Sequence, residues 1–291
     1  MNIIKPKFEI IEQQYNKETL LEDMFKHIEI CGRTCYKSED KITEDSAKKF
    51  VNMLINNGHG AMLEHGTVYM EVPIEHWREN EHEWVYMFPD RCPWVSLDCD
   101  GDWMYITTNF RHILNGDVGE TLMKQYMCGP TENHEKRYTL KFTTSIGITR
   151  ELIRHRHMSF ANESTRYCNY SKNGFNNEIT VVIPSWCKGL YSGNSYDMTT
   201  AKMCGESENI KPLEQRFIMS NCFAEEIYME YIQDGLKPQE AREVLPLCTK
   251  SEIIMTGFES DWKDFFKLRC DKAAHPDMQL IANKAKELLK F

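Results

Sequence analysis

The sequence predicts a fold of the α+β class. Alternating apolar and polar residues at 67–72, 103–108 and 138–144 are typical of strands that are buried on one face. Apolar residues at helical spacing over 213–233 and 278–289 predict amphipathic helices. The sequence has no Gly-x-Gly-x-x-Gly fingerprint and no Walker loop, so a bound dinucleotide would have to be held by side chains.

The N-terminal part predicts two helices within residues 17–58, which end at Asn57-Gly58. We expect a loop between them at 31–38, where Arg33 and Ser38 are weak candidates for a phosphate site. A glycine-rich turn at 59–66 then precedes the first strand and indicates a backbone that approaches a ligand closely. Its two histidines and one glutamate could suggest a metal, but a further ligand at a recognisable spacing is missing.

Residues 73–137 are predicted to be an insertion in a single catalytic domain that spans 1–291. The segment holds four of the six tryptophans, a hairpin turn centred on Asp100-Gly101, a strand at 103–108 and a short helix at 118–126. It could form a lid, an oligomer contact or additional sheet.

The remaining elements follow from periodicity and from prolines and glycines. After the strand at 138–144, residues 148–153 are expected to be helical, and a strand is expected at 179–184. A polar loop is expected over 188–211. The helix at 213–233 is closed by Gly235, and the next one begins at Pro238 and is terminated by Pro246. The last two helices are expected at 261–269 and 278–289.

Composition restricts the class of protein. A formal net charge of -9 argues against a nucleic-acid partner, because neutralising a phosphate backbone needs a basic face. We expect no membrane segment and a cytoplasmic location, because no apolar run is long enough to span a bilayer. The eleven cysteines are scattered, so reduced and mostly buried thiols are expected.

The chemistry is concentrated in residues 154–167, where Arg154, Arg156 and Arg166 surround two histidines. Guanidinium groups pair with phosphate oxygens and stack on flat rings, so the cluster predicts a nucleotide. The alternative is a solvated helix end that is paired with acids. The polar residues that follow, Ser159 to Ser164, argue against this alternative.

Arg154-His155-Arg156, followed by seven residues and Ser164 and then by Arg166-Tyr167, resembles the signature of the flavin-dependent thymidylate synthases. The resemblance extends over 31–72 and 138–282. Its further marks are Arg33 to Tyr36, His59 to His65, Ala241 to Pro246, and Leu268-Arg269.

This resemblance implies that dUMP is reductively methylated to dTMP. The carbon would come from methylenetetrahydrofolate, and NADPH would be the reductant, acting through bound FAD. It also implies a mixed, largely antiparallel sheet with packed helices, and a homotetramer whose subunits share active sites.

The resemblance assigns Arg269 to the pyrimidine edge as the catalytic residue. For dUMP it implies the ligands Glu151, Arg154, Asn162, Glu163, Ser164, Thr165, Arg166, Arg242 and Arg269. For FAD it implies the ligands His59, Ala61, Glu64, Arg154, His155, Arg156, Asn162, Phe258, Ser260 and Asp264. No metal is implied.

Some of these positions depart from the family pattern, so flavin affinity and binding pose are less certain than nucleotide binding. Their residues in this chain are Ala61, Asn162, Phe258, Ser260 and Asp264. Two alternative functions stay open: a related flavoenzyme that hydroxymethylates or otherwise modifies a pyrimidine nucleotide, and a non-catalytic nucleotide-binding homologue. A zinc deaminase is disfavoured, because its His-x-Glu and Cys-x-x-Cys motifs are absent.

Overall fold

The computed structural model describes residues 1–89, 92–116, 118–206 and 209–291, and it confirms the α+β class. The helices are α1 (Leu20–Tyr36), α2 (Ser46–Asn56), α3 (Gly60–Leu63), α4 (Ile74–Met87), α5 (Phe110–Asn115), α6 (Gly119–Tyr126), α7 (Ile146–Leu152), α8 (Met198–Met203), α9 (Pro212–Gln233), α10 (Pro238–Ala241), α11 (Glu259–Arg269) and α12 (Pro276–Leu289). The strands are β1 (Asn2–Ile4), β2 (Lys7–Ile10), β3 (Thr67–Pro73), β4 (Ser96–Cys99), β5 (Trp103–Asn109), β6 (Met127–Cys128), β7 (Arg137–Ser145), β8 (Ser159–Asn162), β9 (Thr180–Val182) and β10 (Lys250–Phe258).

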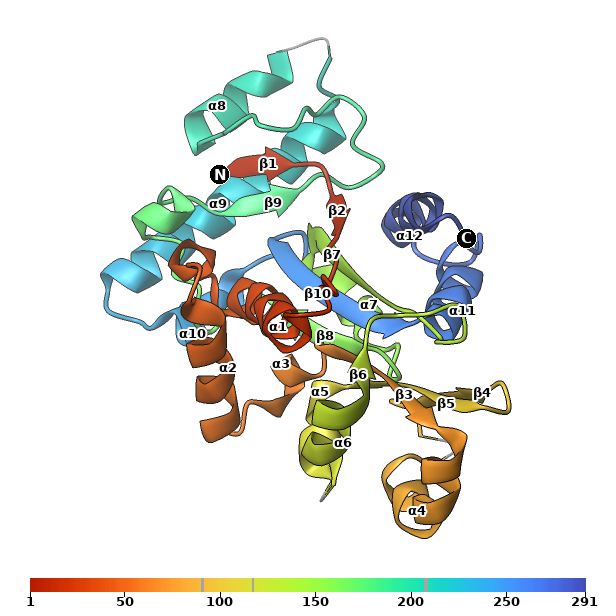
Figure 1. Ribbon diagram of the computed structural model, residues 1–291. Helices are drawn as coiled ribbons and strands as arrows, with labels where there is room; N and C mark the ends of the chain where they lie inside the picture. Colours follow the sequence, from red (N-terminus) through yellow and green to blue (C-terminus); the bar gives the residue numbers. More distant parts are fainter. Residues whose placement is uncertain (90–91, 117, 207–208) are drawn as a thin grey trace.

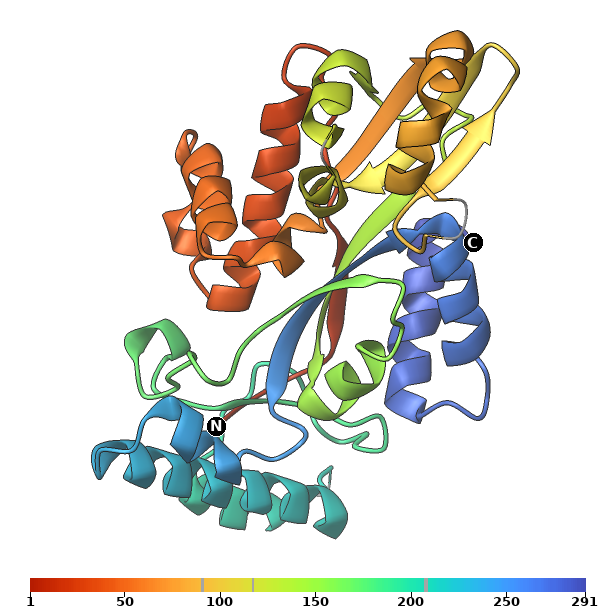
Figure 2. The ribbon, with the colours of Figure 1, turned by 90° about the horizontal axis from the view of Figure 1, so that it is seen from below.

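The central sheet has the strand order β2-β7-β10-β8, and each neighbouring pair is antiparallel. Figures 1 and 2 show α1 to α3 on one side of this sheet and α11 and α12 on the other. Ile254 of β10 packs into the core on the side of α1, whereas Ile253 and Met255 pack against α11 and α12. Since β10 is buried on both faces, it is the strand around which the helices are arranged.

The segment 73–137 extends the sheet structure. Its strands add to β3 in a second antiparallel sheet of order β4-β5-β3-β6. Trp77 and Trp84 of α4 belong to the same apolar cluster as Met24 of α1, so the segment packs into the main body of the protein. Of the three possibilities considered for this segment, a lid, an oligomer contact or additional sheet, the structure shows additional sheet. Residues 90–91 and 117 of the segment lie outside the described residues.

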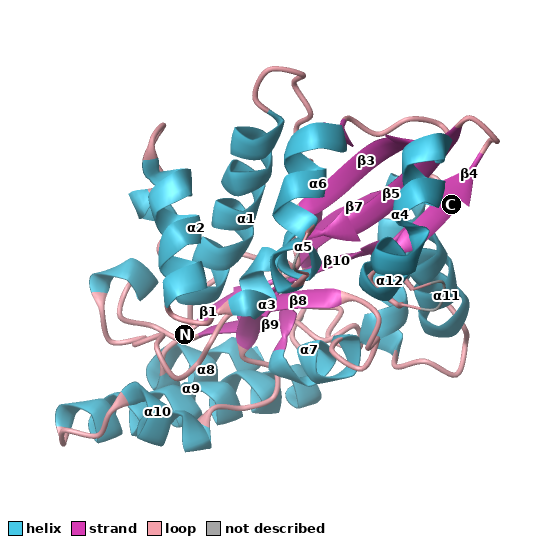
Figure 3. Ribbon diagram, turned by 60° about the horizontal axis from the view of Figure 1, so that its bottom comes forward, coloured by secondary structure: helices cyan, strands magenta, loops and turns pink. Residues whose placement is uncertain are grey.

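A third region lies around α9. The short parallel pair β1 and β9 packs with α9 and α8 in a separate apolar cluster that contains Ile3, Val181 and Ile218. Figure 3 shows the strands in the middle of the molecule with the helices around them. The antiparallel character expected for the sheet is confirmed, and β1–β9 is the parallel exception.

Most expected elements are confirmed, including the hairpin at Asp100-Gly101, where the Asp100 amide donates to the carbonyl oxygen of Trp103. Two expectations are wrong, and one strand was not expected. Residues 31–36 continue α1 instead of forming a loop, and Arg33 pairs with Glu29 at 2.7 Å instead of offering a phosphate site. Residues 198–203 of the expected loop form α8, and residues 207–208 lie outside the described residues. The run 159–162 forms β8, with Ser159 and Ala161 buried.

The cysteines and the helices bear on two further expectations. All eleven cysteines are free, but only Cys31, Cys168, Cys187 and Cys222 are fully buried, so the expectation of mostly buried thiols is only partly right. No helix in the described part of the chain is both long enough and apolar enough to cross a bilayer.

Two histidines are buried in the centre of the molecule. His27 Nε2 lies 3.1 Å from Thr139 Oγ1, and His65 Nδ1 lies 2.7 Å from Thr256 Oγ1. The two threonine hydroxyls lie 2.8 Å apart and join the histidines in one chain of hydrogen bonds. Burial lowers the pKa of both imidazoles to about 3, and the charge of Arg137 adds to the effect. Both rings are therefore neutral in the folded protein at neutral pH.

This pair should make the protein unfold more easily in mild acid. Below about pH 6.5 the unfolded chain binds a proton at each histidine, whereas the folded chain does so only near about pH 3. The free energy of unfolding should therefore decrease as the pH is lowered through this window, by up to about 1.4 kcal/mol per pH unit for each histidine. Urea unfolding between about pH 7 and about pH 4 measures this slope.

Comparison with variants assigns the slope to the buried rings. His27→Gln should make the pH dependence shallower by the contribution of one histidine. Equal slopes in the wild type and in His27→Gln would show that this imidazole does not titrate between the folded and unfolded states as described.

Candidate functional site

Two helix ends meet at the residue predicted to be catalytic. α7 ends at Leu152, and Arg269 at the end of α11 reaches across to it. Arg269 Nη1 lies 3.2 Å from Glu151 Oε2, Nη2 donates to the Glu151 carbonyl oxygen at 2.9 Å, and Nε donates to His155 Nε2 at 2.9 Å. The arginine side chain is 14% exposed, so it is held in one place and is not a solvated cation at a helix end.

The contact with Arg269 fixes the state of His155. Burial lowers the pKa of the imidazole to about 4, and the charge of Arg269 lowers it further in the same direction. The ring is therefore neutral, and because Nε2 accepts from Arg269, the remaining proton is on Nδ1. The ring also packs edge-to-face on Phe265 with centroids 4.8 Å apart. His155, which follows Arg154 in the signature, thus orients Arg269.

The loop after β8 carries the second half of the signature, and hydrogen bonds to two other segments hold its start in place. Ser251 Oγ donates to Asn162 Oδ1 at 3.0 Å, and Cys35 Sγ donates to the Asn162 carbonyl oxygen at 3.0 Å. The Ser164 amide donates to the carbonyl oxygen of Cys35. The end of α1 and the start of β10 therefore position this loop.

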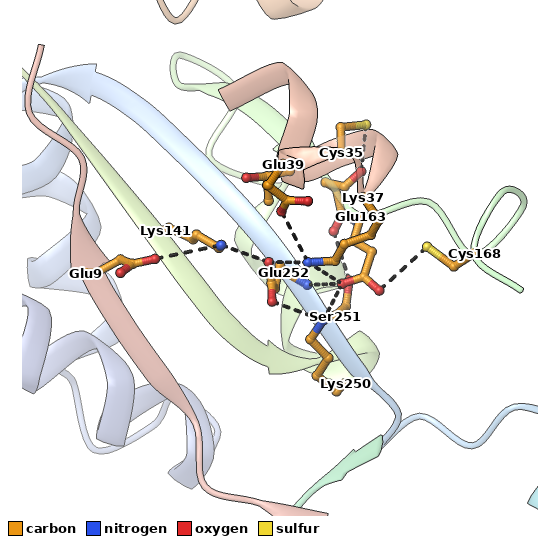
Figure 4. A network of polar contacts seen from close by, with 12 residues as sticks. Glu9, Cys35, Lys37, Glu39, Lys141, Glu163, Cys168, Lys250, Ser251 and Glu252 are labelled. Carbon is orange, nitrogen blue, oxygen red and sulfur yellow. Dashed lines mark hydrogen bonds and ion pairs between the residues drawn. The ribbon is translucent and has the colours of Figure 1, made fainter. Parts of the chain in front are cut away.

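Glu163 is the most deeply buried carboxylate of the loop, with a side chain that is 1% exposed. Lys250 Nζ donates to its Oε2 at 2.8 Å, and the Glu252 amide donates to the same oxygen at 3.1 Å. Figure 4 shows that these residues form one network with Lys37 and Lys141. The structure therefore gives Glu163 the role of an anchor, and its assignment to dUMP stays a prediction.

Glu252 is the second carboxylate of this network. It contacts Lys37 Nζ at 2.5 Å, Lys141 Nζ at 2.9 Å and Lys250 Nζ at 3.0 Å. Burial opposes its ionisation, but the lysines outweigh burial and lower the pKa of Glu252 to about 2. Glu252 therefore stays ionised, and the cluster joins the end of α1, β7, the residue after β8, and β10 behind the signature loop.

Arg242 is brought to the same loop from a distant part of the sequence. It begins a short 3-10 helix, Arg242–Val244, directly after α10. Its Nη1 lies 3.4 Å from Thr165 Oγ1, and its Nε lies 3.9 Å from the exposed Glu243 carboxylate. Two residues predicted to bind dUMP, Arg242 and Thr165, are thus neighbours in the structure.

An aromatic group lies beside them at the surface. The Tyr36 hydroxyl lies 2.9 Å from His59 Nδ1, and the rings of Tyr36 and Tyr167 lie 6.4 Å apart. The guanidinium of Arg166 lies 5.5 Å from the Tyr167 ring centroid. His59 and Ala61 are exposed, so the start of α3 presents them to solvent next to the signature loop.

Glu64, predicted to bind the flavin, is held by the segment 73–137. Arg111 Nη1 of α5 lies 2.6 Å from Glu64 Oε1. A Cβ atom on Gly60 would lie 2.9 Å from Arg111 Nε, so the absence of a side chain at Gly60 lets this arginine approach α3. Arg111 is 46% exposed and adds a positive charge to this face.

Arg154 and Arg156 lie in the turn between α7 and β8, and both are exposed. Among the described residues, neither side chain forms an ion pair, although the nearby carboxylates Glu151 and Glu163 are engaged by other cations. Arg166 likewise has no ion pair in the described part of the chain. These arginines are therefore available to an anionic ligand.

The residues predicted near the adenosine part of FAD lie at the start of α11. Phe258 is 6% exposed and packs under Arg137, whose guanidinium lies 5.5 Å from the ring centroid. Ser260 is exposed and its amide donates to Glu135 Oε1, while Asp264 is exposed one turn further on. Among the described residues, no contact joins any of these three to His59. Their assignment to the flavin therefore stays a prediction.

Several residues of the site were not expected from the sequence. They are the anchors of the signature loop and the partner of Glu64, namely Cys35, Lys37, Arg111, Lys141, Lys250, Ser251 and Glu252. The run of β-forming residues at 252–258 is a signal that could have predicted β10 and, with it, the lysine that precedes the run.

The sequence of this chain is similar to those of known proteins. A family model described as thymidylate synthase complementing protein matches residues 117–290. A flavin-dependent thymidylate synthase of Synechocystis sp. is 25% identical over 150 residues, which is 52% of this chain and 64% of the relative. A probable flavin-dependent thymidylate synthase of Paramecium bursaria Chlorella virus 1 is 24% identical over the same shares. That of Corynebacterium diphtheriae is 28% identical over 50% of this chain and 54% of the relative.

The matches therefore span less than two thirds of these relatives' own length. The family match covers more than half of the present chain and includes the signature, Arg242 and Arg269. A flavin-dependent enzyme family implies a flavin cofactor. The chain belongs to the thymidylate synthase complementing protein family, which is the family of the flavin-dependent thymidylate synthases.

Proposed function

We propose that this protein is a flavin-dependent thymidylate synthase that converts dUMP to dTMP. The observation that carries this proposal is that Arg154, Arg156 and Arg166 are exposed and form no ion pair within the described residues, whereas Arg269 is rigidly held. The exposed cations suit phosphate groups, and the fixed guanidinium suits a planar ring edge.

Arg269 acts on the pyrimidine. Attack on the uracil ring moves negative charge onto its N3/O2/O4 edge, and a donor that is already oriented stabilises that charge without reorganising. Glu151 and His155 hold the guanidinium in place, and the neutral His155 does so without adding a competing positive charge. Arg242, next to Thr165, holds the dUMP phosphate.

The residues around the signature fit the anionic part of a flavin cofactor. Arg156 and Arg154 offer free guanidinium groups, His59 is exposed with one ring nitrogen on Tyr36, and Glu64 is fixed by Arg111. Bound FAD would supply the two-electron transfer from NADPH. The methylene carbon of methylenetetrahydrofolate becomes the C5 methyl group, the C5 proton is lost, and two electrons from NADPH complete the methyl group.

We also propose that a second copy of the chain completes the site, as in a homotetramer. Arg154, Arg156 and Arg166 lie at an open surface, so one copy leaves part of a ligand exposed. Water must be kept from the reacting atoms, and packing of another subunit over this surface would provide that exclusion.

Tritium release from [5-³H]dUMP tests the function, with methylenetetrahydrofolate, NADPH and FAD supplied together. We expect release that depends on all of these components and a product with the mass of dTMP. A product heavier by one oxygen atom would indicate the hydroxymethylating relative instead. Purified protein that stays colourless after FAD is added, and that binds dUMP without releasing tritium, would favour the non-catalytic homologue.

Replacing Arg156 by alanine should weaken FAD binding by about tenfold, because a hydrogen bond to a charged group is worth about 1.5–3 kcal/mol. Fluorescence titration of the apoprotein with FAD measures the dissociation constant. Arg150→Ala is the matched control, since Arg150 is also exposed and lies on the same helix end. An FAD dissociation constant that is the same in both variants would remove Arg156 from the flavin site.

Replacing Arg111 by alanine should also raise the FAD dissociation constant, by about threefold to tenfold, since Glu64 then loses the cation that orients it. The melting temperature should hardly change, because an ion pair as exposed as this one adds little stability. Arg78→Ala, an exposed arginine of α4 in the same segment, should leave both quantities unaltered. Equal affinity in all three proteins would separate the segment 73–137 from flavin binding.

A further inference from the structure

A cavity of about 340 Å³ lies away from the signature loop. It is open to solvent on one side and is lined by β2 and the chain that follows it, by β3, by the start of β7 and by the end of α12. Apolar and aromatic side chains form most of its wall, among them Ile10, Tyr69, Tyr138 and Leu289. A cavity of this size and lining suits a small organic molecule.

Arg137 lines this cavity and has an unusual environment for an arginine. Its side chain is 9% exposed, and among the described residues no carboxylate lies within ion-pair distance of it. Nη1 donates to Thr67 Oγ1 at 3.3 Å and Nη2 to the Glu64 carbonyl oxygen at 3.1 Å. Nε is buried and has no hydrogen-bond partner in the described part of the chain. The protein thus holds a buried guanidinium that is only partly satisfied.

The other polar groups of the cavity do not neutralise this charge. The Gln13 side chain is occupied by both backbone groups of Thr67, at 2.7 and 2.8 Å. Tyr15 and Tyr69 are in edge-to-face contact, and burial raises the pKa of both phenols, so they stay uncharged. Lys136 and Glu12 also line the cavity, but both are exposed and their opposite charges balance.

A buried and unpaired cation is costly, and the cost is removed when an anion binds to it. The neighbourhood shows the effect of the charge, because burial and then Arg137 lower the pKa of His27. Each Nη of Arg137 carries a second N–H besides the one it donates to Thr67 or to the Glu64 carbonyl oxygen, and the two together form a fork that a carboxylate accepts in pairs. The apolar walls would exclude a strongly hydrated inorganic dianion and favour an acid with an apolar body.

We propose that this cavity binds a small organic monocarboxylate, with the carboxylate on Arg137 and the apolar body between Tyr69, Tyr138 and the end of α12. None of the lining residues belongs to the signature, to the 3-10 helix of Arg242 or to the end of α11. Among the described residues, Arg137 touches the predicted flavin ligands only through the Glu64 carbonyl oxygen and the Phe258 ring. Either proposal can therefore fail without the other.

Thermal-shift and calorimetric titrations test the site with benzoate and hexanoate as probes. Both should raise the melting temperature in a concentration-dependent way, because they bind the folded state alone. The uncharged benzamide, which has nearly the shape of benzoate, should have no effect, and inorganic phosphate should have none either. If neither carboxylate binds at concentrations up to about 10 mM, the cavity holds only water and the proposal is wrong.

Variants locate the binding. Arg137→Lys keeps the charge but loses the fork, and it should weaken benzoate binding by about tenfold or more. Leu288→Trp fills the cavity from the partly exposed end of α12, so it should abolish binding even if Arg137→Lys fails to fold. Arg156→Ala should bind benzoate like the wild type. Benzoate binding that survives Leu288→Trp, or that is lost in Arg156→Ala, would place the carboxylate elsewhere and overturn the proposal.

Discussion

Replacing Arg269 by alanine should lower the turnover number for dTMP formation by about 10²–10³-fold, the cost of removing a donor that stabilises charge in a transition state. The reason lies in how the arginine is held. Glu151 and His155 fix its guanidinium before any ligand binds, so the energy of orienting it is not spent during the reaction. FAD content should stay as in the wild type. Tritium release under single-turnover conditions, together with the flavin absorbance of the purified protein, measures both quantities.

Two further variants separate charge from geometry. Arg269→Lys keeps a positive charge but loses the planar fork, and it should recover only a small part of the lost activity. Lys267→Ala removes an exposed cation from the same last turn of α11 and should leave turnover unchanged. A turnover number for Arg269→Ala within about twofold of the wild type would exclude Arg269 from the chemistry.

Replacing Lys250 by methionine should destabilise the protein by about 3–5 kcal/mol, because the change leaves the carboxylate of Glu163 buried without its nearest cation. The signature loop should lose its anchor with it, so that the KM for dUMP rises although Lys250 is not assigned to the nucleotide. Urea unfolding and dUMP kinetics measure the two effects.

A double variant shows whether the pair itself is responsible. Adding Glu163→Gln to Lys250→Met removes the unpaired charge, and it should restore much of the lost stability. If Glu163 is an anchor, the double variant should also recover part of the affinity for dUMP. If Glu163 instead contacts the nucleotide directly, the second substitution should raise the KM further. The exposed pair Lys124–Glu120 on α6 provides the control, since Lys124→Met should cost little.

The sequence predicts the elements whose pattern is local. α9 and α12 follow from helical spacing, and Pro212 and Pro276 mark their first turns. β10 has a weaker signal, since the run of β-forming residues at 252–258 contains only three consecutive large apolar side chains, Ile253 to Met255. The continuation of α1 through Gly32 is also hidden. A Cβ at Gly32 would lie 2.7 Å from Phe50, so the glycine allows α1 and α2 to approach and does not end the helix.

The site follows the same division. The signature and Arg242 are recognisable as residues, and the structure brings Arg242 to Thr165. Local patterns do not predict the partners that come from distant segments, such as Lys250 for Glu163 and Arg111 for Glu64. These pairings depend on strand register and on how the segment 73–137 packs, which only the assembled fold determines.

β10 links both halves of the proposed active site along one stretch of backbone. At its start, Lys250 and Glu252 anchor the signature loop, and at its end Phe258 leads into the helix that terminates in Arg269. Nine residues of extended chain measure about 30 Å, and the strand is fixed by neighbours on both edges. The signature loop and the start of α11 are therefore held at a constant distance by this one strand, and an insertion or deletion of one residue within it would misalign both at once.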